Sequence, residues 1–531
     1  MKSMMKGWIV PALFFCCALS FSGTSCRLTP GHPAILLNQV GFYPGASKRA
    51  LIKGDRYQRF RVLTHPDAKL AFEGILSSAR IWESAMDTVQ MADFSGLADT
   101  GTFILSVDGL GESHVFRIAP SVHKDLHHAL WKAYFYQRSS TSLTTQYGGK
   151  WSHETAHRDE QVMVHESAAS AGRPAGSIMA APGGWYDAGD YGKYTNSTTY
   201  TTWSMLHLYE AFPDHYQAFQ TDFPEQGNQI PDILDEAMWS LGFLLQMQEP
   251  DEGFVYHKLT TAKHARRIMP EMDQETRYVI GKSAPGNLGF AAVMAQAARI
   301  LRPFKPAFAD SCLHAAQKAW TWGMAHPEVL YLNNPAGIHT GKARDASITD
   351  DQQWAAAELF LTTGDSLYLN SANLLQVKTR KFPSRRNVSM LGLYSLSLHP
   401  DRHAYQTDIN RLIRRMAAPV IAEARTQSAY GVPIGFAPKQ FNWGSNSLVA
   451  SMGVAAWKAY QLDQDSAALH AAIDALDYIL GRNALGQSMV TAFGSRSPQN
   501  IHHRWSTADG VAEPIPGWMV GGPQNQLNRD R

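Results

Sequence analysis

The sequence predicts a mostly helical protein in which a small β-sandwich precedes an all-α toroid. Short β-branched and alternating runs, separated by Gly, Asp and Pro turns, fill residues 34–118. Apolar stripes at helical spacing begin after Ala119-Pro120 and continue nearly to the end of the chain. The 531 residues are 44% hydrophobic and 18% charged, which is enough material for more than one packed core.

The N-terminal segment is typical of an export signal. Lys2 and Lys6 precede an apolar run over 8–21, and small residues follow it. Because that run is too short to span a bilayer well, we predict that residues 1–25 form a signal peptide. Alternatively, Cys26 behind small residues is similar to a bacterial lipoprotein attachment site. An exported protein is expected, either periplasmic, extracellular or lipid-anchored to a bacterial outer membrane.

Charge and cysteine content indicate which partners are not expected and whether disulfides stabilise the fold. The chain has 48 basic and 46 acidic residues and a formal charge of +2, so no nucleic acid or anionic membrane is expected as a partner. Contact with a membrane is expected only through a lipid on Cys26. Cys26 and Cys312 are the cysteines behind the signal, so a disulfide framework is not predicted. Cys312 lies in an apolar helical stretch and is predicted to be a buried small hydrophobe.

Within residues 34–118, the runs 59–63 and 102–107 are the clearest strands. The segment 37–44 is predicted to form a strand and a turn at the start of the sandwich. In the helical part, Asn287 is a candidate cap before Leu288, and Asp465 or Ser466 caps the Ala-rich stretch that follows. Helices are predicted where apolar stripes recur: 126–134, 196–213, 230–248, 287–302, 310–325, 350–362, 404–424, 443–462 and 466–480.

The segment 183–194, GGWYDAGDYGKY, carries the most informative chemistry in the chain. Asp187 and Asp190 are separated by small residues and flanked by aromatic ones, so both carboxylates can project into one cleft. Such a pair suits general-base catalysis, in which one carboxylate takes a proton from water and the other orients that water. The alternative interpretation of an Asp-x-x-Asp spacing is an Asx-rich turn or a calcium loop.

The same segment resembles the base motif of glycoside hydrolase family 9, whose members mostly hydrolyse β-1,4-glucans with inversion. By this resemblance Asp190 is the catalytic base and Asp187 helps to hold the nucleophilic water. A second match, at 488–496 followed by Ile501-His502-His503-Arg504, satisfies the His-x-Arg signature of the family. The resemblance therefore implies that His502 acts in the catalytic site and that Arg504 binds substrate.

Further stretches resemble the same family: 129–138 its first catalytic-domain helix, 231–236 its third and 350–359 a helix in the middle of that domain. The segment 37–44 resembles the opening strand of the immunoglobulin-like module that precedes many bacterial members. The resemblance implies an immunoglobulin-like β-sandwich over 34–118 and an (α/α)6 barrel catalytic domain over 122–531.

Three aromatic or imidazole side chains complete the predicted site. Trp443 matches a position where the family stacks an indole on a glucosyl ring, although a core tryptophan at a helix start is the alternative. His257 and Tyr186 are assigned to substrate binding, and a hydrogen-bonded structural role is the alternative for His257.

The resemblance implies no cofactor for the chemistry. Family members often bind structural calcium, but no EF-hand-like spacing is present, so metal ligands are not assigned. The segments 263–282 and 327–349 are predicted to be loops without assigned chemistry.

The end of the sequence raises an expectation about catalysis. In the family, an Asn-Glu pair that heads the last helix supplies the general acid after a segment like 516–523. This chain ends at Arg531, and Glu513 precedes that segment. We therefore expect the last helix and the acid to be missing, with loss of an ~10²- to 10⁴-fold contribution to the rate.

The function predicted from the sequence is hydrolysis of internal β-1,4-glucosidic bonds in cellulose or related β-glucans by inversion, with the activity of this chain in doubt. The alternatives are a catalytically inactive relative that binds glucan, and a hydrolase that acts on β-glucan oligosaccharides from one end.

Overall fold

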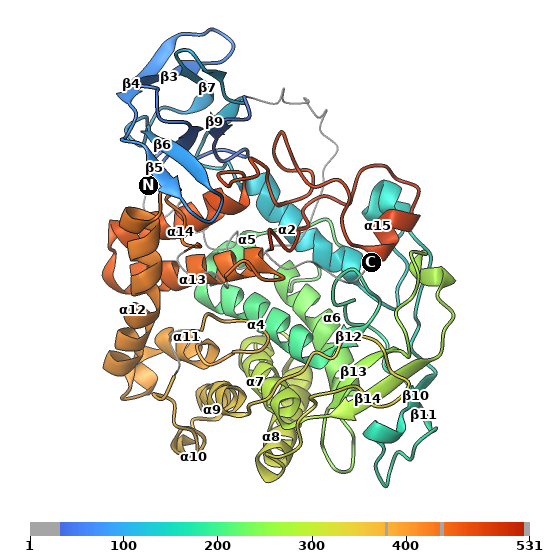
Figure 1. Ribbon diagram of the computed structural model, residues 1–531. Coiled ribbons are helices and arrows are strands. Elements are labelled where there is room, and N and C mark those ends of the chain that lie inside the picture. The colour runs from blue at the N-terminus through green and yellow to red at the C-terminus, as the bar shows by residue number, and fades with distance from the viewer. Residues whose placement is uncertain (1–31, 378–380, 436–439, 525–531) are drawn as a thin grey trace. The chain divides into compact units, whose positions relative to one another are not determined.

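The computed structural model describes residues 32–377, 381–435 and 440–524 (Figure 1). The predicted signal peptide and Cys26 lie outside the described residues. Its strands are β1 (Ile35–Leu36), β2 (Arg49–Lys53), β3 (Arg59–Thr64), β4 (Leu70–Ile75), β5 (Arg80–Trp82), β6 (Asp87–Asp93), β7 (Gly101–Val107), β8 (Gly111–Glu112), β9 (Phe116–Ile118), β10 (Val162–Val164), β11 (Ile178–Met179), β12 (Lys193–Tyr194), β13 (Tyr256–Thr261) and β14 (Arg277–Lys282). Its α-helices are α2 (Lys124–Gln137), α3 (Thr145–Gly148), α4 (Thr195–Ala211), α5 (Pro213–Ala218), α6 (Asp232–Gln246), α7 (Ala284–Leu301), α8 (Pro306–Ala325), α9 (Thr349–Thr363), α10 (Ser366–Asn370), α11 (Leu391–Ser397), α12 (Gln406–Ala422), α13 (Ser445–Asp463), α14 (Ser466–Ile479) and α15 (Arg504–Ala508).

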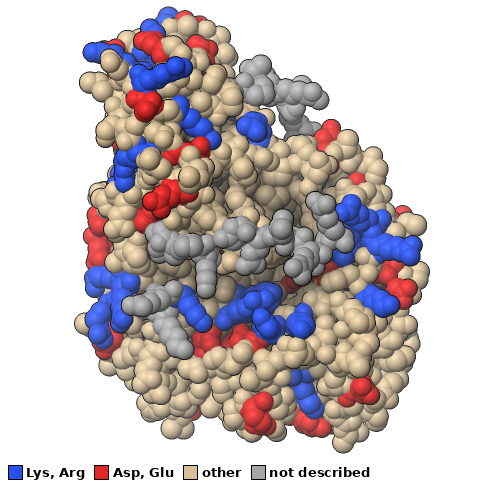
Figure 2. Space-filling model, viewed as in Figure 1, with Lys and Arg blue, Asp and Glu red and all other residues tan. Residues whose placement is uncertain are grey.

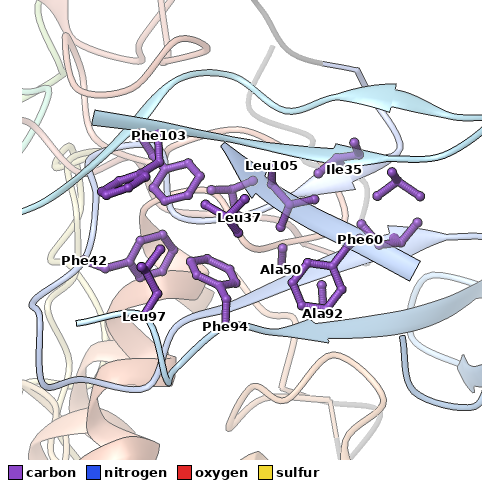
Figure 3. Close-up of a cluster of buried hydrophobic side chains, with 14 of the residues drawn as sticks. Ile35, Leu37, Phe42, Ala50, Phe60, Ala92, Phe94, Leu97, Phe103 and Leu105 are labelled. Atoms are coloured by element: carbon purple, nitrogen blue, oxygen red, sulfur yellow. The ribbon is translucent and has the colours of Figure 1, made fainter. Parts of the chain in front are cut away.

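The N-terminal strands form two antiparallel sheets. One has the order β1-β2-β6-β5, and the other has the order β4-β3-β7-β8 with β9 also paired to β7. Buried apolar side chains from both sheets fill the space between them (Figure 3). Phe42 lies edge-on to Phe94 and Phe116, with ring centroids 5.4 and 5.6 Å away. The predicted sandwich is confirmed, and its strands β3 and β7 match the two runs chosen from the sequence.

Of the strand and turn predicted over 37–44, the structure forms the turn, while the strand ends earlier. Pairing in β1 stops at Leu36, and the Asn38 carboxamide oxygen then accepts hydrogen bonds from the backbone N–H groups of Val40 and Gly41. Gly41 has a φ of 131°, and a Cβ there would lie 2.4 Å from the carbonyl oxygen of Arg117. The Asn side chain and the Gly backbone therefore form a tight turn directly behind Leu36.

The contacts divide the chain into two compact units. Among the described residues, one comprises 32–133, 413–435, 440–501 and 513–524, and the other comprises 134–377, 381–412 and 502–512. In the first unit the sandwich packs on the C-terminal helices. The ring centroids of Trp82 and Tyr430 are 4.1 Å apart, and the Asn38 amide donates to Asp477 at 2.8 Å.

A buried carboxylate, that of Asp474 in α14, joins the two parts of this first unit. Arg49 of β2 forms an ion pair with it, as do Arg482 at 2.8 Å and Arg425 at 3.1 Å. Burial alone would raise the pKa of Asp474, but the three guanidinium groups outweigh burial and lower it. The carboxylate is therefore held in its charged form between the sandwich and the helices.

The helices predicted from apolar periodicity are confirmed, with ends shifted by a few residues: α2, α4, α6, α7, α8, α9, α12, α13 and α14. The Asp465 cap is confirmed, because its carboxylate accepts from the N–H of Ala467 at 3.0 Å. The Asn287 cap is wrong. Helix α7 begins at Ala284, and the Ser283 hydroxyl accepts from the N–H of Gly286. Pro285 fits the first turn of this helix, where no backbone donor is needed.

A mixed sheet in the second unit was not predicted. It has the order β11-β10-β14-β13-β12 and occupies part of the segment expected to be loop. All six residues of β13 are buried, including His257 and Lys258. Because polar residues take buried positions, the strand lacks the apolar alternation by which a sequence reveals a strand.

Two other expectations concern burial and the membrane. Cys312 is fully buried and unpaired, which confirms its predicted role as a small apolar residue. Among the described helices, none combines the length and the apolar character that crossing a membrane requires.

Candidate active site

The loop between β11 and β12, two strands of the mixed sheet, carries both predicted catalytic carboxylates. The N–H of Asp187 donates to the carbonyl of Gly192 at 2.9 Å, which closes the loop just before β12. Gln137 donates to the carbonyl of Ala188 at 2.8 Å and anchors the loop to the end of α2. Both Asp187 and Asp190 then line one cavity of about 320 Å³. The predicted convergence of the two carboxylates is what the structure shows.

The Asp190 carboxylate is held by neighbours on more than one side. Its Oδ2 accepts from the N–H of Gly192 at 3.2 Å and from the Tyr194 hydroxyl at 3.1 Å. The Nδ1 of His264 lies 3.5 Å from the same oxygen. Tyr194 is itself oriented, because its oxygen accepts the N–H of Gly341 at 3.1 Å. These contacts fix the direction of Asp190 through Oδ2, while Oδ1 has no hydrogen-bond partner among the described residues.

Asp187 has a different environment from Asp190. It is exposed to the cavity, yet protein surrounds it on the other sides. Desolvation and the nearby charge of Asp190 raise the pKa of Asp187 to about 6, against opposing effects of Ser197 and Arg385. Asp187 can therefore exchange a proton near neutral pH, as general-base chemistry requires.

Arg504 holds the loop of Asp187 and Asp190 in place by hydrogen bonds. The carbonyl of Gly189 accepts from the Arg504 backbone N–H at 3.1 Å and from Nη1 at 2.8 Å. The Nε of Arg504 donates to the carbonyl of Ala265 at 2.7 Å, so one guanidinium joins the 187–190 loop to the segment of His264. The side chain predicted to bind substrate thus holds two loops of the site together, and its contact with substrate stays a prediction.

The approach of these segments explains a glycine in the motif. A Cβ on Gly189 would lie 2.0 Å from the carbonyl oxygen of His502. The imidazole of His502 is exposed and lines a second, smaller cavity of about 110 Å³, together with Arg504 and residues 265–267. The backbone of His502 thus packs against Gly189 in the loop that carries Asp187 and Asp190. Its catalytic role stays a prediction.

The other predicted substrate ligands lie in different settings. His257 is buried, and its ring nitrogens contact the Ser283 hydroxyl at 3.2 Å and the Lys342 carbonyl at 3.0 Å. These bonds support the 341–344 segment of the cavity wall. Tyr186 is also buried, with its hydroxyl 2.7 Å from Nδ1 of His157. Trp443 precedes α13 and is 67% exposed, which excludes a core role for this indole. For all three, substrate contact stays a prediction.

Several cavity residues were missed by reading the sequence. His264 and 341–344 fall in segments that were predicted to be loops without chemistry, and Arg385 and Arg386 received no assignment. None of them belongs to a periodic run or a recognisable motif. The only signal in the sequence was the basic pair at 385–386 and the histidine in a polar segment, and neither indicates a site without the fold.

Metal binding is not indicated by the described part of the chain. Within residues 32–377, 381–435 and 440–524, no group of three or more His, Cys, Asp or Glu side chains is arranged to hold an ion. The structural calcium implied by the resemblance stays a prediction.

Comparison with known proteins gives consistent results. Residues 123–530 match Glycosyl hydrolase family 9, and residues 31–112 match the cellulase N-terminal ig-like domain. The sequence is 36% identical over 530 residues to a xyloglucan-specific endo-beta-1,4-glucanase, BoGH9A, of Bacteroides ovatus, covering 94% of this chain and 88% of the relative. It is 31% identical over 544 residues to Endoglucanase D of Acetivibrio thermocellus, covering 98% and 82%.

Solved structures agree with the sequence relatives. The Bacteroides ovatus GH9 structure has a TM-score of 0.88 at 35% identity, covering 93% of this chain and 92% of that chain. A structure of AaCel9A in complex with cellobiose-like isofagomine has a TM-score of 0.84 at 30% identity, covering 93% and 91%. The predicted fold class, an (α/α)6 barrel preceded by an immunoglobulin-like sandwich, is confirmed.

Proposed function

The chain belongs to glycosyl hydrolase family 9, and we propose that it hydrolyses internal β-1,4-glucosidic bonds of a β-glucan with inversion at the anomeric carbon. The observation that carries this proposal is the cavity of about 320 Å³ that Asp187 and Asp190 share. The similarity to a xyloglucan-specific endo-beta-1,4-glucanase and to Endoglucanase D supports the endo mode of action.

Asp190 is proposed as the general base. Its carboxylate takes a proton from a water molecule, and the water oxygen attacks the anomeric carbon from the face opposite the leaving oxygen. Tyr194 and the N–H of Gly192 keep the carboxylate pointed into the cavity. Asp187 accepts the second hydrogen bond of the water, and its raised pKa reflects how strongly the pair binds a proton.

The leaving oxygen must take a proton from a general acid, which in an inverting enzyme stands roughly 6.5–9.5 Å from the base. The water-activating half of the reaction is the part that the described pocket supports.

The test is reducing-sugar release from barley β-glucan and carboxymethyl cellulose. Three proteins are compared: the 531-residue chain, its Asp190→Ala variant, and a form extended by the native downstream sequence. Activity that appears with the extended form and is lost with Asp190→Ala supports the base and places the acid downstream. Activity of the present chain would mean that it holds an acid of its own. If both the 531-residue chain and the extended form bind glucan but hydrolyse none, the result would instead support the glucan-binding alternative.

Export is proposed for the same protein on the pattern of residues 1–25, with basic residues, an apolar run and small residues in order. Mass spectrometry of the protein from its host distinguishes cleavage behind that run from a lipid on Cys26. A protein recovered with its N-terminal methionine intact would contradict export by either route.

A further inference from the structure

Arginine side chains gather at the cavity that holds the catalytic pair. Arg344, Arg385 and Arg386 line it, and Lys342 lies on the same wall. Lys and Arg also form visible clusters on the face drawn in Figure 2. A pocket built only for a neutral glucan needs hydroxyl-bonding and stacking groups and has no electrostatic need for so many cations.

The described residues offer these arginines no ion pair, in contrast to two buried or half-buried arginines of the same unit. Arg138 pairs with Glu225 and Glu236, and Arg299 pairs with Glu210 and Glu358. In contrast, no carboxylate of the described chain pairs with any of the three cavity arginines, and Nη1 of Arg385 is buried without a hydrogen-bond partner there. A buried donor without a partner costs free energy, so an acceptor is expected to reach it from the cavity.

Three carboxylates face the cluster, but none forms an ion pair with it among the described residues. Asp187 and Asp190 line the same cavity, and Asp345 influences Arg386. Burial lowers the pKa of Arg386, and the like charges of Arg385 and Arg344 lower it further, against the opposing effect of Asp345. Burial and the neighbouring cations together outweigh Asp345 at Arg386, and an anion bound beside the arginines would offset both.

We propose that the cavity binds a carboxylate carried by the glucan chain, such as the carboxylate of a uronic acid residue, through Arg344, Arg385 and Arg386. Guanidinium groups match the planar carboxylate with paired hydrogen bonds, and they bind it more strongly than a neutral hydroxyl. This inference rests on the proposed function, since it names the class of glucan that the same cavity accepts. Sulfate and phosphate groups share the anionic oxygen chemistry, and the experiment separates them from a carboxylate.

The test uses polymers of matched chain length and degree of substitution: hydroxyethyl cellulose, carboxymethyl cellulose and cellulose sulfate. The readouts are kcat/KM on each polymer and retardation of the protein in native gels that contain it. The variant is Arg344→Gln with Arg386→Gln. The control is Arg302→Gln with Arg411→Gln, which removes the same charge from exposed ion pairs with Asp310 and Asp408.

The wild type is expected to favour carboxymethyl over hydroxyethyl cellulose in both readouts. The cavity variant should lower that ratio by about tenfold, the size of one charge-assisted hydrogen bond, while the control variant keeps the wild-type ratio. An equal fall in both variants, or no preference in the wild type, would overturn the proposal. A stronger preference for cellulose sulfate would overturn the carboxylate in favour of a sulfated glucan.

Failure of the proposed function has a separate signature. If neither the 531-residue chain nor the extended form hydrolyses any polymer, the activity is refuted, while the gels still report whether the arginines select the anionic polymer.

Discussion

Two clusters of arginine in this protein are built in opposite ways. In the first unit, Arg49, Arg425 and Arg482 surround the buried carboxylate of Asp474 and join the sandwich to the C-terminal helices. At the catalytic cavity of the second unit, Arg344 and Arg386 face open space, and the described residues give them no carboxylate partner. The difference teaches how to tell a structural charge from one kept for a ligand: a structural charge is paired inside the protein.

The paired cluster should be the most sensitive to mutation. Asp474→Ala removes the shared carboxylate and leaves buried guanidinium groups that repel one another. Loss of one partner from a buried ion pair costs about 3–5 kcal/mol, and we expect a decrease of that size in the free energy of unfolding. Urea unfolding followed by tryptophan fluorescence measures it.

The matched control is Asp463→Ala. Its exposed ion pair with Arg414 should contribute only about 0.2–1 kcal/mol. Equal losses for the two variants would show that pairing at Asp474 has no special importance.

The geometry of the cavity depends on close packing of backbone segments more than on ion pairs. Gly189→Ala would place a methyl group against the carbonyl of His502 and push the loop of Asp190 out of place. A displacement of that kind can lower the rate by about 10²-fold. We expect such a loss in kcat/KM on barley β-glucan, with a lowered melting temperature, because the methyl group meets backbone atoms of His502 and His503. Gly242→Ala, which meets nothing within 4 Å, serves as the control.

The influence of Arg385 on the acid pair predicts a change in pH dependence. The folded-state pKa of Asp187 is raised to about 6, so its neutral form stabilises the fold at low pH, and this contribution is lost as the pH rises through about 6. Activity needs the ionised form and should fall as the pH drops through the same value. Because Arg385 opposes the rise in pKa, Arg385→Gln should move the acid limb of the kcat profile to higher pH. A limb that stays in place or moves to lower pH would contradict this role.

The smallest expected effect is the change in the free energy of unfolding when a cavity arginine is replaced. Arg344 is exposed and has no ion pair with the described residues, so Arg344→Gln should change the free energy of unfolding by no more than about 0.5 kcal/mol. Arg482→Gln is the sharpest contrast, because it breaks a buried pair. A marked destabilisation by Arg344→Gln would show that the arginine serves the fold.

The sequence predicted the parts of this protein that depend on periodicity or on local motifs. Apolar stripes located the long helices, and the Asp187/Asp190 spacing located the carboxylates that meet in the cavity. The mixed sheet escaped prediction because β13 buries polar residues and shows no alternation. The early end of β1 escaped because the Asn38 side chain replaced backbone pairing.

The rest of the cavity depends on contacts between distant segments. His264 approaches Asp190 from a loop without periodicity, and Arg504 reaches Gly189 and Ala265 across hundreds of positions of the chain. Arg385 is also distant in sequence from both aspartates. Only the folded chain shows that these residues share a site.

The most direct test of the account is proton NMR of cellopentaose during hydrolysis, with the form of the protein that is active on barley β-glucan and with its Asp190→Ala variant. If Asp190 activates water for inversion, the α-anomer of the product appears first and Asp190→Ala leaves the substrate intact. Initial release of the β-anomer, or an Asp190→Ala variant that works at the wild-type rate, would contradict Asp190 as the base.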